Sequence, residues 1–183
     1  AQMEIWGVKI DKNYLAKLSD KFTKKINELE IEIFKITKSK FNIGSTKQLG
    51  EILYNQLKIA SLKRTKKGSF ATSASVLEDL AFKGHKLPKF ILDWRQITKL
   101  KNTYSDSLPE HLNPNTKRIH TSFLLAATTT GRLASSDPNL QNIPIKTEDG
   151  KEIRKSFVAE KGNSLVSADY NQIEMRILAE IAD

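Results

Sequence analysis

Two acidic residues near the end of the chain are spaced for phosphoryl-transfer chemistry. The segment SLVSADYNQIEMRILAEIAD predicts a strand over 165–168 that ends at Asp169. A helix is expected from about Gln172, with Glu174 on its first turn. Carboxylates at the end of a buried strand can hold magnesium, often as two ions roughly 3.5–4 Å apart. The same pattern also fits a helix-capping Asp169 and a solvated Glu174 stabilised by the helix dipole.

A long helix is predicted from Asp11, a candidate cap, to about Lys38. Apolar residues recur along it at steps of three and four: Leu15, Leu18, Phe22, Ile26, Leu29, Ile33 and Ile36. Lysines occupy much of its remaining surface. This periodicity is typical of one helix of a bundle.

Three further helices are expected before residue 104. Ser45 and Gln48 fit a capping box at the start of a short helix, and Ser73 can cap a third. Pro88 suits the first position of a fourth helix, which carries Phe90, Ile91, Trp94, Ile97 and Leu100 on one face. Residues 8–104 therefore predict two long antiparallel helices with two short ones at the tip.

The pattern changes after residue 104. Turn residues surround a predicted strand over 119–125, and a loop-rich stretch, TTTGRLASSDPNLQNIP, covers 128–144. A short helix is expected over 152–157. Together with the strand over 165–168, these elements predict an α+β fold dominated by helices.

Composition and charge exclude several classes of protein. The 183 residues are 39% hydrophobic and 28% charged, which excludes a disordered chain, and no apolar run is long enough for a membrane span. No basic segment followed by an apolar stretch opens the chain, so no signal peptide is expected. The absence of Cys excludes disulfides and thiol catalysis and favours a reducing compartment.

The formal net charge of +9 is concentrated in residues 1–70, which carry 15 basic and 7 acidic side chains, against 15 and 14 in residues 71–183. This asymmetry predicts a polyanion partner, with nucleic acid the first choice and an anionic membrane the second. A lysine-rich soluble surface explains the charge equally well.

Several motifs, in order, resemble those of family A DNA polymerases, the bacterial DNA polymerase I family. DYNQIEMRILA (169–179) resembles motif A, usually DYSQIELR, and TGRLASSDPNLQNIP (130–144) is similar to the TGRLSSxxPNLQNIP signature. FNIGSTKQLGEIL (41–53) and WRQITKLKNTY (94–104) resemble two upstream motifs, and GVKID (7–11) also belongs to the pattern. Motif A departs from its usual form only at Asn171 and Met175, both mild changes.

The resemblance implies a helical thumb over 1–104, with its tip around 41–75, and the first part of an antiparallel palm over 105–183. It implies a DNA-directed DNA polymerase, a nucleotidyltransferase of DNA replication and repair that adds dNTPs to a primer 3′-hydroxyl by two-metal chemistry. The fingers and the second metal-binding aspartate would follow residue 183. We therefore expect this stretch alone to bind primer–template duplex without polymerising. The alternative is a non-catalytic duplex DNA-binding module.

Partners and location also follow from the resemblance. We expect primer–template DNA and, in the complete enzyme, dNTPs, with no membrane and no obligate protein partner. The implied location is the bacterial cytoplasm, in association with the nucleoid, and an organelle or phage origin remains open.

The resemblance assigns catalytic roles to Asp169, Glu174 and Arg132. Asp169 and the backbone carbonyl of Tyr170 would bind the two Mg²⁺ ions. Glu174 would exclude a ribose 2′-hydroxyl, and Tyr170, Gln172 and Glu174 would form the nucleotide site. Arg132 would reach the minor groove at the primer terminus, where acceptors occupy similar places in every correct pair. A structural salt bridge is the alternative for Arg132.

Contacts with DNA are implied for one further set of polar side chains: Ser45, Lys47, Gln48, Lys63, Arg64, Lys66, Lys67, Arg95, Lys99, Arg132, Asn139, Gln141 and Asn142. The basic residues among 63–67 would supply sequence-independent phosphate affinity. Turn chemistry explains the three amides almost as well, and an exposed helix face is the alternative for Arg95 and Lys99. The apolar residues of the last helix, Ile173, Ile177 and Leu178, are predicted to be core, and His120 is predicted to be structural.

Overall fold

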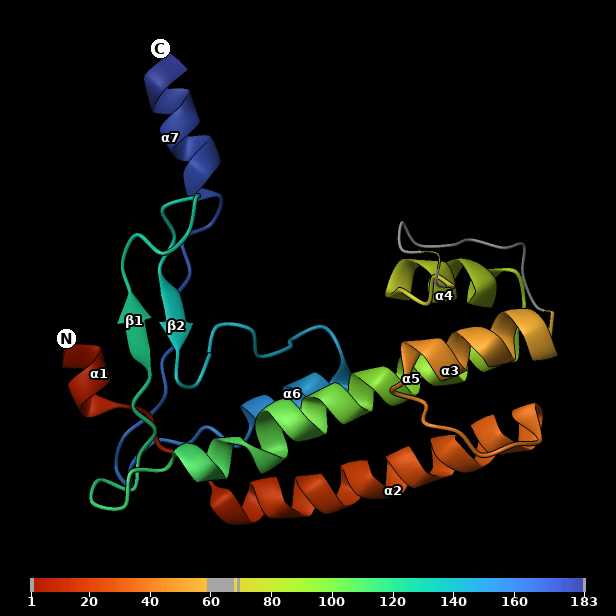
Figure 1. Ribbon diagram of the computed structural model, residues 1–183. Helices are drawn as coiled ribbons and strands as arrows, with labels where there is room; N and C mark the ends of the chain where they lie inside the picture. The colour runs from red at the N-terminus through yellow and green to blue at the C-terminus, as the bar shows by residue number, and fades with distance from the viewer. Residues whose placement is uncertain (1, 59–67, 69, 183) are drawn as a thin grey trace.

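Two long antiparallel helices form the frame of the molecule. The computed structural model describes residues 2–58, 68 and 70–182, and in it α2 (Lys12–Thr37) lies beside α5 (Lys86–Leu100) (Figure 1). The Asp11 carboxylate accepts the Tyr14 N–H at 2.9 Å, and α2 is followed by its C-cap Lys38, whose φ is +53°. The predicted cap and both predicted ends of α2 are confirmed.

Helix α5 begins two residues earlier than predicted. His85 precedes its first residue, so Pro88 occupies the third helical position rather than the first. Proline is tolerated there because the first backbone N–H groups of a helix have no intrahelical acceptor. Trp94 then donates its indole N–H to Glu30 of α2 at 3.0 Å, which links the two helices.

Shorter elements form the tip: α3 (Thr46–Gly50), the π-helical turn η1 (Glu51–Gln56) and α4 (Ala74–Phe82). Ser45 caps α3 by accepting the Gln48 N–H at 3.4 Å, but the reciprocal half of the predicted capping box is absent. The Gln48 side chain instead accepts the Asn42 N–H at 2.7 Å, because Ser45 N–H already donates to the Asn42 carbonyl. Ser73 precedes α4 as predicted, yet its hydroxyl contacts Ser75 rather than capping the helix.

Two hydrophobic clusters stabilise this arrangement. One lies at the tip and includes Ile33, Leu49, Leu53, Leu77 and Ile91. The other lies at the opposite end of the helical pair and combines residues from both halves of the chain: Leu15, Leu18, Phe22, Leu100, Tyr104, Leu108, Ile119 and Ile153. Because this second cluster includes residues on both sides of position 104, the helical pair and the mixed segment share one core.

After α5 the chain continues as a π-helical turn, η2 (Lys101–Asp106), and a 3₁₀ turn, η3 (Leu108–His111). Strand β1 (Ser122–Leu124) then pairs antiparallel with β2 (Ala134–Ser136), with Phe123 opposite Ser135. The strand predicted over 119–125 is therefore shorter, and Ile119 forms isolated bridges with Val8 and Leu112 instead. The short helix α1 (Gln2–Trp6) lies against β1, where Glu4 accepts the Phe123 N–H at 2.8 Å.

The last third of the chain contains α6 (Glu148–Arg154) and α7 (Ile173–Ala182). Helix α6 begins four residues before its predicted start, because the Thr147 hydroxyl caps it by accepting the Gly150 N–H. The prediction of a strand over 165–168 is wrong, because these residues form no strand and are exposed. A strand needs a neighbouring ladder, and no described segment supplies one.

The prediction that Ile173, Ile177 and Leu178 form core is also wrong. They are 41%, 52% and 58% exposed, and no residue of α7 is buried. Figure 1 shows α7 extending away from the rest of the molecule. The expected α+β class is confirmed by long helices and one antiparallel strand pair. Among the described residues, no helix is both long and apolar enough to cross a membrane.

Candidate functional site

Asp169 and Tyr170 lie at the end of an extended segment that leads into α7. Both are exposed. The turn into the helix is held by Arg176, whose N–H bonds the Gln172 carbonyl and whose guanidinium bonds the Asn171 carbonyl. An N-cap directly precedes the first helical residue, and Asp169 lies four positions before Ile173. Asp169 therefore does not cap α7, and its carboxylate is accessible to a cation.

Arg132 lies beside Glu174. A guanidinium nitrogen of Arg132 is 3.7 Å from a carboxylate oxygen of Glu174, and the two side chains are 79% and 75% exposed. Ion pairs this exposed contribute little to stability, typically less than about 1 kcal/mol. Arg132 thus forms the salt bridge considered as the alternative role, but the ion pair is weak and leaves the guanidinium accessible.

The loop over 139–142 presents three amide side chains, all exposed. The side-chain oxygen of Asn139 accepts the Gln141 N–H at 3.0 Å, and the Gln141 amide nitrogen donates to the Leu133 carbonyl at 2.9 Å. Turn chemistry therefore occupies the oxygen of Asn139 and one amide hydrogen of Gln141. It does not use the amide nitrogen of Asn139, which is the donor that a base acceptor would require.

A hollow of about 380 Å³ brings part of this loop against the end of α5. Lys99, Asn139 and Asn142, all predicted to contact DNA, line it together. The backbone carbonyl of Asn142 accepts a hydrogen bond from the hydroxyl of Tyr104, which also lines the hollow. Residues far apart in sequence thus meet where the helical pair joins the mixed segment.

Arg95 has a different environment from Lys99, although both lie on α5. Its guanidinium donates to the Thr72 carbonyl at 2.6 Å and is half-buried, and this burial lowers the pKa of Arg95. Lys99 is exposed. Arg95 therefore links α5 to the segment before α4, and Lys99 is the more accessible of the two cations.

The predicted tip residues lie at the far end of the molecule from α7 (Figure 1). Lys47 and Gln48 are exposed on α3, and Ser45 is half-buried as its cap. The predicted residues Lys63, Arg64, Lys66 and Lys67 lie outside the described residues. His120, predicted to be structural, has both ring nitrogens engaged, one with the Glu4 carbonyl and one with the Thr116 hydroxyl.

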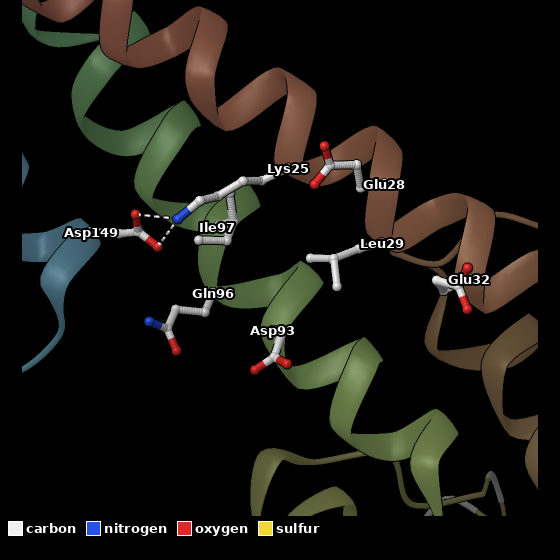
Figure 2. A pocket seen from close by; sticks show the side chains of 8 residues that line it. All are labelled: Lys25, Glu28, Leu29, Glu32, Asp93, Gln96, Ile97 and Asp149. Carbon is white, nitrogen blue, oxygen red and sulfur yellow. Dashed lines mark hydrogen bonds and ion pairs between the residues drawn. The ribbon is translucent and has the colours of Figure 1, made fainter.

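A second hollow, of about 340 Å³, was not anticipated (Figure 2). It lies between α2, α5 and α6, and four of its lining residues are acidic: Glu28, Glu32, Asp93 and Asp149. Lys25 bonds both oxygens of Asp149, at 2.6 and 2.8 Å. No local sequence signal indicates this hollow, because its residues come from three separate helices. Its acidic lining would repel phosphate groups.

A group of three or more acidic or histidine side chains that could hold a metal does not occur within the described part of the chain. Asp169 and the Tyr170 carbonyl offer oxygen ligands of the kind that magnesium prefers. This pair fits a cation that is also ligated by water or by substrate phosphates.

Comparison with known proteins identifies the class. The sequence model of the family described as DNA polymerase family A matches residues 12–183 of this chain. The chain belongs to DNA polymerase family A. It is 51% identical over its whole length to DNA polymerase I of Rhizobium leguminosarum, covering 18% of that protein. It is 46% identical to the thermostable DNA polymerase I of Thermus aquaticus, covering 22%.

A solved structure has the same fold. The POL domain of Pol1 from M. smegmatis, in complex with DNA primer–template and dNTP, superposes with a TM-score of 0.85 at 38% identity. That match covers 97% of this chain and 31% of the other. The chain spans about a fifth of the length of the curated relatives that it matches.

Proposed function

We propose that this chain is the duplex-binding thumb, residues 1–104, and the first part of the palm, residues 105–183, of a DNA-directed DNA polymerase. The complete enzyme would add dNTPs to a primer 3′-hydroxyl during DNA replication and repair. The observation that carries the proposal is the approach of Arg132, from the TGRL segment, to Glu174 of motif A at 3.7 Å. Two motifs separated in sequence converge where the resemblance expects a primer terminus.

Asp169 and Tyr170 would hold the divalent metal, proposed to be Mg²⁺. When bound, the metal would lower the pKa of the primer hydroxyl and neutralise charge on the departing pyrophosphate. The protein would contribute the carboxylate of Asp169 and the carbonyl of Tyr170. Glu174 would close the sugar side of the nucleotide site, and Gln172 would line it.

DNA would contact two surfaces. Arg132, Asn139, Gln141 and Asn142 would donate to minor-groove acceptors, which report pairing geometry without reading sequence. Lys99 would contact the template, with Arg95 placing the helix that carries it. At the tip, phosphate contacts are proposed for a basic and polar set: Ser45, Lys47, Gln48, Lys63, Arg64, Lys66 and Lys67. These contacts would give affinity that falls with salt.

We also propose a role in the cytoplasm of a bacterium, which the bacterial relatives support, and a location at the nucleoid. Primer–template DNA and dNTPs are the proposed partners, since both are bound in the M. smegmatis structure. No obligate protein partner is proposed.

Substituting Asp169 tests the catalytic proposal. In a full-length polymerase carrying this segment, Asp169→Ala should reduce primer extension by more than about a thousandfold, because metal stabilisation of the transition state is worth several kcal/mol. Binding of a fluorescein-labelled primer–template, measured by anisotropy, should change little. Glu180→Ala removes a different exposed carboxylate, one that lies on α7, and should retain activity.

The alternative function is a non-catalytic duplex-binding module. The charge split between residues 1–70 and 71–183 supports duplex binding under either function. The alternative predicts that Asp169→Ala leaves extension unchanged. If Asp169→Ala abolished duplex binding as well, Asp169 would be structural and its catalytic assignment would be wrong.

A further inference from the structure

The loop over 139–142 needs a fixed backbone if its amides are to sense minor-groove geometry. Near its start, the buried hydroxyls of Thr121 and Ser135 lie 2.7 Å apart. Thr121 Oγ1 is 2.8 Å from the Pro138 carbonyl oxygen, and the Leu140 N–H donates to Ser135 Oγ at 3.2 Å. One end of the loop is therefore held against the β1–β2 pair.

At the other end of the loop, the side chain of Tyr104 bonds the backbone. The Tyr104 hydroxyl donates to the Asn142 carbonyl at 2.5 Å. Tyr104 is 4% exposed, and its ring belongs to the cluster that contains Leu15, Leu18 and Phe22. Burial raises the pKa of Tyr104 further above its ordinary value, at which a phenol is already a protonated donor at neutral pH.

Tyr104 also connects the loop to the helix that carries Lys99. It lies on η2, which continues α5 without a break, and η2 is linked to α2 through Asp106, which accepts the Ser19 hydroxyl at 2.6 Å. Lys99, Tyr104 and Asn142 line the same hollow. The phenol thus joins the end of the α5–η2 helix directly to the backbone of the loop.

We propose that Tyr104 is a positioning residue whose hydroxyl sets where the 139–142 amides meet the minor groove, without contacting DNA itself. This inference rests on the proposed function. It predicts that removing the hydroxyl weakens recognition of minor-groove acceptors more than it weakens phosphate binding.

Tyr104→Phe keeps the ring in the core and removes only the hydrogen bond. Tyr54→Phe is the matched control, because Tyr54 is also buried and donates to a backbone carbonyl, that of Ala71 at 2.8 Å, but at the tip. Each variant would be titrated with a matched primer–template and with the same duplex carrying 3-deazaguanine near the primer terminus. That base lacks the N3 acceptor of the minor groove.

The wild-type chain should bind the 3-deaza duplex roughly fivefold more weakly, which corresponds to about 1 kcal/mol for one hydrogen bond. In Tyr104→Phe the ratio of the two Kd values should fall toward one, with an unchanged dependence of binding on salt. Tyr54→Phe should keep the wild-type ratio. A purely structural Tyr104 would lower the unfolding midpoint but preserve the ratio, and that result would overturn the proposal.

Two further variants distinguish a failure of the proposed minor-groove contacts from a failure of the proposed role of Tyr104. Asn142→Ala should lose discrimination directly, and Thr121→Val, which loosens the other anchor of the loop, should lose it without touching Tyr104. If the wild-type chain binds both duplexes equally, the minor-groove part of the proposed function fails, and the role of Tyr104 fails with it. If the wild type discriminates and Tyr104→Phe does so equally well, only the role of Tyr104 is wrong.

Discussion

Gly7 occupies a position where the backbone leaves no room for a side chain. Its φ is +59°, and a Cβ there would lie 2.4 Å from the Ile119 carbonyl oxygen and 2.8 Å from a ring nitrogen of His120. The next residue, Val8, exchanges two backbone hydrogen bonds with Ile119, each 2.8 Å long. The close approach of these two backbone segments therefore depends on glycine.

Gly7→Ala should lower the free energy of unfolding by more than about 2 kcal/mol, because left-handed strain and a backbone clash add together. Gly84→Ala is the control: its φ is +90°, but nothing lies within 4 Å of the added Cβ. The control should lose only the free energy that left-handed strain costs, about 1–2 kcal/mol. Urea unfolding followed by circular dichroism measures both, and equal losses would show that the clash is relieved without cost.

Ionisation of the Tyr14 side chain makes the free energy of unfolding depend on pH in the alkaline range. Burial, followed by the hydrogen bond to Glu152 and its charge, raises the pKa of Tyr14 from 10.0 to about 12. The folded state thus favours the neutral phenol. Its contribution is fully present below the unfolded pKa of about 10 and is lost as pH rises through about 12.

Tyr14→Phe should therefore be less stable than the wild type at neutral pH, with the difference shrinking as pH rises from about 10 to about 12. Urea midpoints measured across this range give the difference directly. A difference that stays constant with pH would mean that Tyr14 ionises equally in both states.

Between elements, Asp106 links η2 to α2 and so supports the region around Tyr104. It accepts the Ser19 hydroxyl at 2.6 Å and the Lys101 ammonium at 2.5 Å. Burial alone would raise the pKa of Asp106, but the hydrogen bonds from Lys101 and Ser19 outweigh it and lower the pKa below 3.8. A lowered pKa stabilises the fold above 3.8, and this stabilisation is lost as pH falls through the folded pKa.

Asp106→Asn should cost about 1 kcal/mol of unfolding free energy at neutral pH, typical of a lost charge-assisted hydrogen bond. The cost should disappear in acid, below the depressed pKa. Asp20→Asn, which removes the charge of an exposed carboxylate on α2, should have almost no effect at either pH. Equal costs in acid and at neutral pH would contradict the ionic role of Asp106.

At the scale of the whole molecule, α7 presents an apolar surface to solvent. Ile173, Ile177 and Ile181 recur one turn apart and are 41%, 52% and 77% exposed. Contiguous exposed apolar surface favours association, whereas isolated exposed apolar residues do not. We therefore expect the 183-residue chain to self-associate through α7.

Sedimentation velocity should show a sedimentation coefficient that rises with protein concentration. Ile177→Glu should remove this dependence by placing a charge within the apolar face. Ile31→Glu should retain it, because Ile31 is 64% exposed but lies on α2, away from α7. A wild-type chain that remains monomeric would show that α7 is covered in solution by the chain itself.

Local sequence patterns determined the long helices and the family of this protein. The periodicity of α2, the Asp11 cap and the antiparallel helical pair follow from the sequence because a helix satisfies its hydrogen bonds between near neighbours. The ordered motifs from 41–53 to 169–179 likewise indicated DNA polymerase family A, since they are themselves sequence patterns.

Tertiary structure decided everything that depends on distant partners. The approach of Arg132 to Glu174, the bond from Tyr104 to Asn142 and the burial of Arg95 against Thr72 each join separate segments. The strand over 165–168 and the buried apolar face of α7 were predicted wrongly for the same reason. A periodic pattern states which side chains favour burial, but only neighbouring chain in space can pair a strand or cover a helix.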